Sequence, residues 1–452
     1  MNMPRHMMLA GYILVPGSHF GGMWRHPYSE TDFCDRAVYE NVARTLERGC
    51  FDVAFVPESL SVPTGPKGDH DALLKYGAVG AVRHDPSHLV APMIAATRHL
   101  GFTITLSTTY MEPYHLARIF GTLDHFSEGR IAWNVVTSAG ESNAYNFGHH
   151  PVLDHAQLYD RADEVVDVCT RLWTSWDKDA IVRDQASGLY AHPDKIHRLD
   201  HEGAYFKVRG PLSLPRGPGA GPVLMVAGVS PRGRDFAARW ADVVFAIQSD
   251  ADGMRELRRD IRARAARFGR ADTPIKLLAA VQPIIGETTE IAQARAAYLD
   301  RLIHPEMARA FFSAMLGMDL ASYDLATPIE EVLRAEDGRT AVDAGAARPW
   351  LQRVVDERPD HTWTLGEVAA KLSQSSSTPR LIGTASEIAD QLEQLFVSEA
   401  CDGFVVTPTH FPGSFEEFTR AVVPELQRRG LMRTKYRHDG FRSEIGVDTR
   451  SA

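Results

Sequence analysis

The segment Val223–Ala241, VLMVAGVSPRGRDFAARWA, carries the clearest chemical signal in the chain. An apolar run ends at Gly228, and Ser230 followed by proline is a common start for a helix. The free N–H groups and the positive dipole at such a helix start favour a bound phosphate. Arg232 and Arg234 add positive charge beside it. The pattern therefore predicts a phosphate site at Ser230, with a purely structural helix cap as the alternative.

The same serine could also be read as the nucleophile of a hydrolase. The run from Gly228 has the spacing GxSxxG, one residue longer than the GxSxG elbow, and a proline follows the serine directly. No ordered set of Ser, Asp and His stands out from the 19 histidines. A serine hydrolase is therefore the weaker alternative.

Two other strands are predicted to end in hydroxyl and amide side chains. Phe102–Thr109 and Ile131–Ser138 are continuous apolar runs, typical of strands buried on both faces of a parallel sheet. Their ends carry Thr108, Asn134 and Thr137. Because ligands bind at the carboxyl ends of the strands in a parallel barrel, we expect these three side chains to line a binding site.

His155 and Tyr159 lie four residues apart at the start of a predicted helix, so they share one face of it. A pair of this kind is more often structural than functional. The loop after the first strand carries His19, Trp24, Arg25 and His26, which either contact substrate or pack on the rim of the fold.

These side chains need a scaffold that brings strand ends together. The helical pattern Leu116, Ile119, Phe120, Leu123 and Phe126 gives the helix after Phe102–Thr109 one buried face, and further helical patterns cover Asp35–Arg48, Ser87–His99, Tyr159–Trp173 and Ala385–Phe396. They alternate with eight strand-like runs: Leu9–Val15, Asp52–Pro57, Phe102–Thr109, Ile131–Ser138, Val223–Gly228, Asp242–Gln248, Ile275–Ile285 and Gly403–Pro408. Eight such units predict an α/β fold, the closed TIM (β/α)8 barrel.

Two intervals are too long to be simple connections. Residues 175–221 are rich in Asp, His, Gly and Pro, and residues 304–379 mix helical pieces with polar turns. Loops of this length are uncommon in compact domains unless they have a function or structure of their own. We expect residues 1–452 to form one barrel domain with these two insertions, which would form a lid or wall over the mouth. A mobile surface excursion is the alternative for the second.

Composition excludes several classes of protein. With 44% hydrophobic and 24% charged residues, the chain has the make-up of an ordinary globular protein, and its net charge of −9 argues against nucleic acid as a partner. No apolar run reaches the roughly 20 residues of a membrane span. The four cysteines are far apart, which suits the cytoplasm. His192, His197 and His201 share no face of a regular element and lack a carboxylate ligand set, so we expect no metal site.

Several segments closely resemble the bacterial-luciferase-like flavin monooxygenases, in particular the nitrilotriacetate and dibenzothiophene-sulfone monooxygenase class. The most specific are STTYMEPYHLAR, LDHFSEGR, and WNVVTS followed by NFG. The resemblance continues through YDRADEVVDVCTRLW, HEGAYFKVRGPL, AGVSPRGRDFAARWADVVF, IGTASEIADQLEQLF and VVPELQRRGLMRTKY, and so covers most of the chain.

The resemblance implies an FMN site and assigns residues to it. Gly228 and Ser230 would hold the FMN phosphate, and His155 and Tyr159 would lie near the phosphate and the ribityl chain. Glu58, in FDVAFVPES, stands where the family usually carries Asp, so its contact with the flavin is less secure. The remaining strand-end residues named above, Thr108, Asn134 and Thr137, would contact the ring and the ribityl group.

The resemblance also implies an activity, a two-component monooxygenase. Reduced FMN would come from a separate NAD(P)H:flavin reductase, and O₂ would oxygenate a small organic substrate through a flavin C4a-(hydro)peroxide. No GxGxxG motif opening a βαβ unit is visible, which agrees with reduction by another protein. We expect a homodimer or homotetramer. A non-catalytic flavin- or deazaflavin-binding barrel is the main alternative, and the identity of the substrate is left open.

Overall fold

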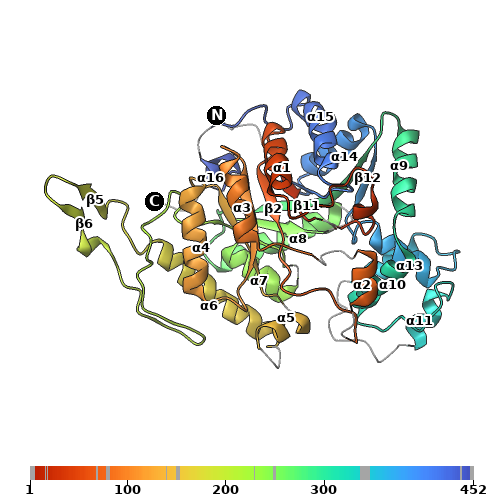
Figure 1. Ribbon diagram of the computed structural model, residues 1–452, viewed down its shortest axis with the longest axis horizontal. Helices are drawn as coiled ribbons and strands as arrows, with labels where there is room; N and C mark the ends of the chain where they lie inside the picture. Colours follow the sequence, from red (N-terminus) through yellow and green to blue (C-terminus); the bar gives the residue numbers. More distant parts are fainter. Residues whose placement is uncertain are drawn as a thin grey trace.

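Eight parallel strands form the centre of the fold (Figure 1). They are β1 (Met8–Tyr12), β2 (Val53–Val56), β3 (Gly101–Ser107), β4 (Ile131–Val136), β9 (Val223–Val226), β10 (Val243–Ala246), β11 (Lys276–Ile285) and β13 (Gly403–Val406). Their order is β10-β9-β4-β3-β2-β1-β13-β11, and β10 pairs with β11 to close the barrel. The computed structural model describes residues 6–15, 17, 19–67, 70–77, 82–138, 140–148, 153–228, 230–247, 251–335, 347–437 and 440–447.

The predicted TIM barrel is confirmed, and each predicted strand has its counterpart in it. Several observed strands end earlier than predicted. β9 stops at Val226 and β3 at Ser107, so Gly228 and Thr108 lie in the loops at the mouth, by which we mean the end of the barrel where the strands finish. The predicted end of the sixth strand, Gln248, lies outside the described residues.

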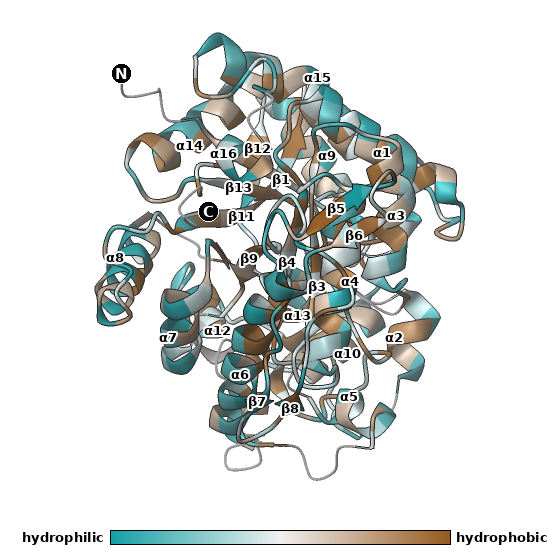
Figure 2. Ribbon diagram, turned by 90° about the vertical axis from the view of Figure 1, so that its left-hand side faces the viewer, coloured by the Kyte–Doolittle hydropathy of each residue, from teal (hydrophilic) through white to brown (hydrophobic). Residues whose placement is uncertain are grey.

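Helices that run back against the strands cover the outside of the barrel (Figure 2). They are α1 (Arg36–Arg48), α3 (Pro86–Ala95), α4 (Pro113–Phe126), α6 (His155–Trp173), α7 (Pro231–Trp240), α8 (Ala251–Arg267), α14 (Ala385–Val397) and α15 (Gly413–Arg428). Leu116, Phe120 and Leu123 of α4 are buried as the helical spacing predicts. Phe126 is 74% exposed instead; it is the last residue of α4, just before the turn that leads to β4.

The barrel interior changes from apolar to polar toward the mouth. Its lower part is filled by an inner cluster that includes Met8, Ala10, Val53, Leu278 and Ala280. Because side chains alternate along a strand, the next inward positions are Asn134 on β4, Gln282 on β11 and Thr407 directly after β13, and all three are buried. The polar side chains therefore gather where a ligand would enter.

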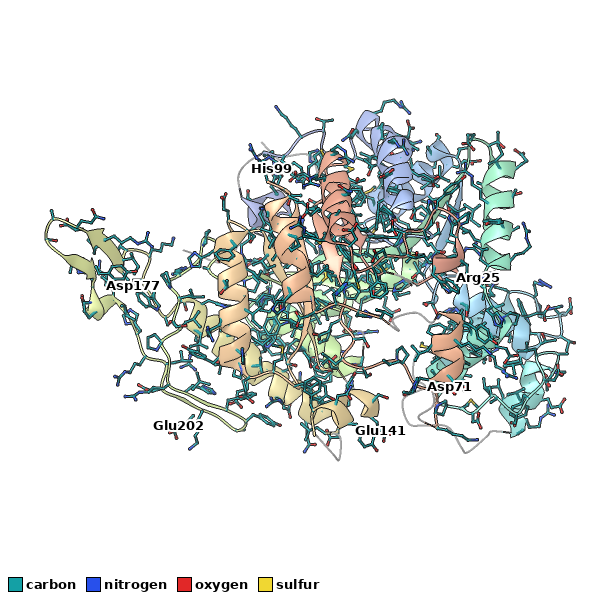
Figure 3. All side chains as sticks on the ribbon, viewed as in Figure 1. Arg25, Asp71, His99, Glu141, Asp177 and Glu202 are labelled. Carbon is teal, nitrogen blue, oxygen red and sulfur yellow. The ribbon has the colours of Figure 1, made fainter. Side chains whose placement is uncertain are left out.

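The first insertion contains two small antiparallel pairs. β5 (Ile181–Asp184) pairs with β6 (Leu189–Ala191), and β7 (His201–Glu202) pairs with β8 (Lys207–Val208), with the short helix η2 (Pro193–Lys195) between the pairs. Figure 1 shows β5 and β6 projecting away from the barrel beyond α4 and α6. In Figure 3, Asp177 and Glu202 mark this segment on the side of the molecule opposite Asp71.

The expectation that this insertion covers the mouth is wrong. The insertion begins at the end of α6. A helix that follows a parallel strand, such as α6, ends at the opposite side of the barrel from the mouth. The insertion then packs on the outer helices: His125 of α4 bonds to the Pro215 carbonyl at 3.0 Å, and Glu164 of α6 accepts the backbone N–H groups of Tyr205 and Phe206 at 2.9 Å.

The second insertion is helical and lies beside the mouth. It follows α9 (Thr289–Arg301), contains α10 (Pro305–Leu316), α11 (Ile329–Ala335), α12 (Ala347–Asp356) and α13 (Leu365–Ser373), and ends at β12 (Arg380–Gly383), which extends the sheet along the end of β11. Residues 336–346 lie outside the described ranges. It contacts α2 (Asp71–Tyr76) where the rings of Tyr76 and His304 stack at 3.6 Å. It also bonds to the loop after β1, where the Gly21 N–H donates to the Ser373 carbonyl at 2.8 Å.

The remaining short elements are η1 (Met23–Arg25), α5 (Glu141–Asn146) and α16 (Phe441–Glu444). The base of the barrel is held by Arg433, which forms ion pairs with Asp52 and with Glu444. In the part of the chain that the structure describes, the four cysteines form no disulfide bond. Of the helices in the described ranges, none combines the length and hydropathy that crossing a membrane requires.

Candidate functional site

The predicted phosphate site lies at the start of α7. Ser230 is the N-cap, and its Oγ accepts a hydrogen bond from the Gly233 N–H at 3.1 Å. The proline at the first helical position has no N–H to donate, while the positive end of the helix dipole would favour an anion here. The local fold that the sequence predicts here is therefore confirmed.

Tyr159 of α6 reaches this helix end from the side. Its hydroxyl hydrogen-bonds to the Ser230 side chain, and burial raises its pKa against the opposing effects of Ser230 and Arg232. Glycine is required next to it: a Cβ at Gly228 or at Gly233 would lie 2.8 Å from the Tyr159 hydroxyl. We call Tyr159, Gly228, Ser230 and Gly233 the α7 cluster. Gly233 was not among the predicted site residues, although the second glycine of GVSPRG marks it.

The two arginines that follow Ser230 do not provide free positive charge. Arg232 bonds to Asp163 at 2.6 Å and to Asp160 at 2.9 Å, and its guanidinium lies 5.4 Å from the centre of the Tyr159 ring. Arg234 pairs with Asp260 at 2.9 Å. The suggestion that both cations add charge to the phosphate site is therefore corrected: aspartates already neutralise them, and neutral N–H and O–H donors make up the α7 cluster.

His155 is the first residue of α6, one turn before Tyr159. The two rings meet edge to face with 5.0 Å between their centres, so the pair shares one face as the spacing predicts. His155 is exposed, whereas Tyr159 is only 8% exposed. His155 is thus placed at the solvent side of the α7 cluster.

Asn134 and Glu58 lie inside the mouth with oxygen atoms that have no partner among the described residues. The Asn134 amide donates to the Thr105 hydroxyl at 2.9 Å, while its Oδ1 is buried and unpaired. Glu58 accepts the backbone N–H of Ser107, and its Oε2 is buried and unpaired. Burial, aided by the charge of Asp85, raises the pKa of Glu58 to about 8.

Thr108 and Thr137 lie at the ends of β3 and β4 as predicted, but they differ in burial and in their hydrogen bonds. The Thr108 hydroxyl is fully buried and donates to the Val136 carbonyl at 3.1 Å, which leaves it only acceptor capacity. Thr137 is half-buried at the rim, and its carbonyl accepts the Thr109 hydroxyl.

Three mouth residues were not predicted from the sequence. Gln282 is 1% exposed, and neither atom of its amide has a hydrogen-bond partner in the described chain. Tyr12, at the end of β1, is buried, and its hydroxyl is hydrogen-bonded to Arg83. Arg83 has a buried Nε without a partner. The one sequence signal that could have identified any of them is the glutamine, Gln282, at an inward position of a strand. We call Tyr12, Glu58, Arg83, Asn134 and Gln282 the mouth cluster.

The loop after β1 was expected either to contact substrate or to pack on the rim, and its residues differ in this respect. His19 is buried, with Nδ1 at 2.9 Å from the Thr378 hydroxyl and its ring 4.7 Å from that of Tyr12; burial and Arg83 lower its pKa to about 4. Trp24, Arg25 and His26 instead pack on the rim, the first two by hydrogen bonds to backbone carbonyls and His26 by stacking on His410.

The comparisons agree with this geometry. The model of the luciferase-like monooxygenase family matches residues 26–402. The chain belongs to this family. Dibenzothiophene-sulfone monooxygenase from Rhodococcus erythropolis strain XP is 40% identical over 99% of this chain and 98% of its own. Nitrilotriacetate monooxygenase component A from Aminobacter aminovorans is 34% identical over 98% and 97%. Among solved structures, riboflavin lyase with modified FMN and riboflavin is 32% identical, with a TM-score of 0.85 over 98% of this chain and 96% of that one.

The residues at hand fit the flavin that this luciferase-like family implies. The α7 cluster offers hydroxyl and N–H donors to a phosphate, and glycines leave room for it. The mouth offers buried, unpaired oxygen and nitrogen atoms of the kind that a ring carbonyl or ring N–H would satisfy. Both halves lie at the carboxyl ends of the strands, where barrel ligands bind.

The other candidate chemistries find less support. The described residues contain no group of three or more side chains arranged for a metal ion; His197 and His201 pair with Asp177 and Glu164. The partners of the Ser230 hydroxyl in the described chain are Gly233 and Tyr159, and a serine nucleophile needs a general base at that place.

Proposed function

We propose that this protein is the oxygenase component of a two-component monooxygenase, which uses reduced FMN and O₂ to oxygenate a small organic substrate. The observation that carries the proposal is the α7 cluster, where the start of α7, the Tyr159 hydroxyl and two closely packed glycines meet beside the barrel mouth in an arrangement suited to a phosphate. Membership of the luciferase-like monooxygenase family over most of the chain supports it.

In this proposal Ser230, Gly228 and Tyr159 hold the FMN phosphate by hydrogen bonds. His155 and Thr137 lie next along the ribityl chain. The ring occupies the mouth, where the unpaired oxygens of Asn134 and Glu58 can accept from its N–H groups and the Thr108 hydroxyl can accept only. Glu58 is protonated at neutral pH when its pKa is about 8, so it can also donate a proton in a hydrogen bond.

Reduced FMN supplies two electrons, with which one atom of O₂ enters the substrate and the other leaves as water. The protein's own task is to bind, orient and exclude water, which needs no catalytic triad, and the hydrogen bonds of Ser230 with described residues show no general base. The helical insertion beside the mouth is suited to this task. Its contacts with His19 and with Gly21 tie it to the loop that borders the site. We propose that it acts as a wall or lid.

Reduction of the flavin is assigned to a separate NAD(P)H:flavin reductase, because the sequence has no dinucleotide-binding motif. The name of one relative, nitrilotriacetate monooxygenase component A, is in keeping with this division. A homodimer or homotetramer, and a cytoplasmic location, are further proposals that rest on the resemblance, and light scattering of the purified protein measures the first of them.

The direct test is stopped-flow mixing of the protein–reduced FMN complex with oxygenated buffer. The proposal expects a transient absorbance that differs from those of both reduced and oxidised FMN and outlasts the oxidation of free reduced FMN. Oxidation at the rate of free FMN, with the flavin bound, would favour the non-catalytic flavin-binding alternative. No binding of flavin, together with labelling by an active-serine probe, would favour a hydrolase.

A steady-state assay tests the two-component part separately. The purified chain with FMN and NADH should consume no NADH, and consumption should begin when a flavin reductase is added. Rapid NADH oxidation by the pure chain would contradict the need for a second protein.

A further inference from the structure

Arg83 is an unusual charge for the inside of a barrel mouth. Its guanidinium donates to the Tyr12 hydroxyl, and its Nε is buried with no partner. Among the described residues, no carboxylate lies close enough to form an ion pair with it. An arginine stays protonated in proteins, and a buried cation without a counter-ion is costly. The fold therefore holds a partly buried guanidinium that forms no ion pair with a carboxylate of the described residues.

The nearest acid does not remove this charge. Glu58 interacts with Arg83 electrostatically, but burial raises the pKa of Glu58 to about 8, so the carboxyl is mainly neutral at pH 7. His19, which also faces Arg83, is neutral as well, since its pKa is about 4. The guanidinium therefore has no ionised carboxylate in ion-pair contact among the described residues, although the charge of Asp85 acts on the neighbouring Glu58.

The FMN phosphate is not the missing counter-ion in the proposed binding mode. The strand order places β9, which leads to the α7 cluster, four strands from β1, which carries Tyr12. In a closed barrel of eight strands, these positions face each other across the mouth. A phosphate bound at Ser230 is thus on the opposite side from Arg83.

Aromatic side chains extend from Tyr12, the hydrogen-bond partner of Arg83, into the barrel. The rings of Tyr12 and Phe55 meet edge to face at 5.4 Å, and those of Phe55 and Phe245 at 5.6 Å, which forms an aromatic floor. Gln282 adds a second polar group. Val281 is paired with Val406, and Val406 with Gly11, so the next residues, Gln282, Thr407 and Tyr12, lie at one level of neighbouring strands.

We propose that Arg83, held by the Tyr12 hydroxyl, binds an oxyanion group of the substrate, a carboxylate or a sulfonate. The aromatic floor binds an apolar part of the same molecule, and the unpaired amide of Gln282 forms a hydrogen bond with a further polar group. A guanidinium suits such a group because its planar donors match two oxygens at once. The substrate class is therefore an organic acid with an apolar body. This inference rests on the proposed function only in naming the ligand as the substrate.

The experiment compares an anion with its neutral isostere. Isothermal titration calorimetry measures the binding of 2-naphthoate, naphthalene-2-sulfonate and 2-naphthamide to the protein, both with saturating oxidised FMN and without it. We expect at least one anion to bind about tenfold or more tightly than the amide, the effect of one charge-assisted hydrogen-bonded pair. The Arg83→Met variant should lose this preference while its affinity for the amide and for FMN stays the same.

Two further variants keep the test decisive. Arg83→Lys retains the charge without the planar donors and should keep part of the preference, which covers the case in which Arg83→Met does not fold. Arg420→Met removes an exposed arginine of α15 and should change nothing. Equal binding of anions and amide by the wild type, no binding of either anion, or a preference that survives removal of Arg83 would overturn the proposal.

A loss of FMN affinity in Arg83→Met would overturn it as well, because Arg83 would then serve the cofactor. The calorimetric binding of the anions and of FMN does not depend on oxygen chemistry. The anion preference can therefore be present in a protein that fails the stopped-flow test, and failure of the wild type to bind FMN would contradict the proposed function alone.

Discussion

At the start of α7, the polar atoms of the site are satisfied by the protein itself: Ser230 bonds to Gly233 and to Tyr159, and Arg232 pairs with two aspartates. Across the barrel, the mouth cluster is the reverse. Oxygen or nitrogen atoms of Glu58, Asn134, Arg83 and Gln282 are buried without partners in the described chain. The difference indicates that the polar atoms of the α7 cluster are already fixed by hydrogen bonds within the protein, whereas the mouth bears a desolvation cost that a bound ligand would offset.

The largest effect is expected where the hydrogen bonds of the α7 cluster are broken. In Gly233→Ala, the new Cβ would lie 2.8 Å from the Tyr159 hydroxyl, 3.0 Å from Ser230 Oγ and 3.1 Å from the Gly228 carbonyl carbon. Both hydroxyls must move, so we expect FMN affinity to fall about 100-fold, the loss of two hydrogen bonds of about 1.4 kcal/mol each. Quenching of FMN fluorescence on binding gives the affinity.

Gly121→Ala is the matched control, since it places a methyl group in helix α4 with its nearest neighbour, Leu214, at 3.4 Å. It should leave FMN binding unchanged. A Gly233→Ala protein that binds FMN as tightly as this control would show that the α7 cluster is not the phosphate site.

Removing a polar side chain should stabilise the ligand-free protein at the mouth and destabilise it at the α7 cluster. Gln282→Leu replaces a buried, unpaired amide by an apolar side chain of similar size, so the ligand-free protein should become more stable by about 1 to 2 kcal/mol. Ser230→Ala, which removes a helix cap, should make it less stable by about 1 kcal/mol. Urea unfolding of the two variants measures the contrast, and a destabilised Gln282→Leu protein would mean that the amide is satisfied after all.

A smaller effect is expected where the second insertion meets the mouth. Thr378→Val removes the hydroxyl that contacts His19 at 2.9 Å and keeps the shape of the side chain. Water access should rise, so the ratio of hydrogen peroxide to product per NADH should increase about threefold, corresponding to roughly 0.6 kcal/mol. The reductase-coupled assay reports the ratio, with Thr122→Val on the exposed face of α4 as control. An unchanged ratio would leave the insertion a role in oligomer contacts instead.

A further prediction concerns pH. The folded-state pKa of Glu58, about 8, lies above the ordinary value of 4.5, so the native state binds a proton that the unfolded chain has released. Stability from this group is therefore present at low pH and declines as pH rises from about 4.5 to 8. The melting temperature of the ligand-free wild type should fall more between pH 5.5 and 8.5 than that of Glu58→Gln. Parallel curves would indicate an ionised Glu58.

The α7 cluster could be predicted because its signal is local. A glycine, a serine and a proline after an apolar strand define a capped helix start, and His155 and Tyr159 are linked by helical spacing alone. The barrel followed for the same reason, since its eight units alternate regularly along the chain. What the local pattern could not show is that Arg232 and Arg234 are already paired with aspartates of α6 and α8.

The mouth cluster could not be predicted in the same way. Tyr12, Arg83 and Gln282 come from the end of β1, from the loop before α3 and from β11, and only closure of the barrel brings these elements together. The lid expected from residues 175–221 failed for a related reason. Length and composition identify an insertion, but its exit point, at the end of α6, decides which side of the barrel it covers.

The central claim is that the α7 cluster binds the phosphate of FMN, and a ligand pair tests it most directly. Calorimetric titration of FMN and of riboflavin, which lacks the phosphate, into wild type and Ser230→Ala gives the phosphate contribution in each protein. We predict that wild type prefers FMN, and that Ser230→Ala reduces this preference by about 10- to 100-fold, or roughly 1 to 3 kcal/mol, while riboflavin affinity stays the same. An unchanged preference, or an equal loss for both ligands, would contradict the account and leave Ser230 as a helix cap only.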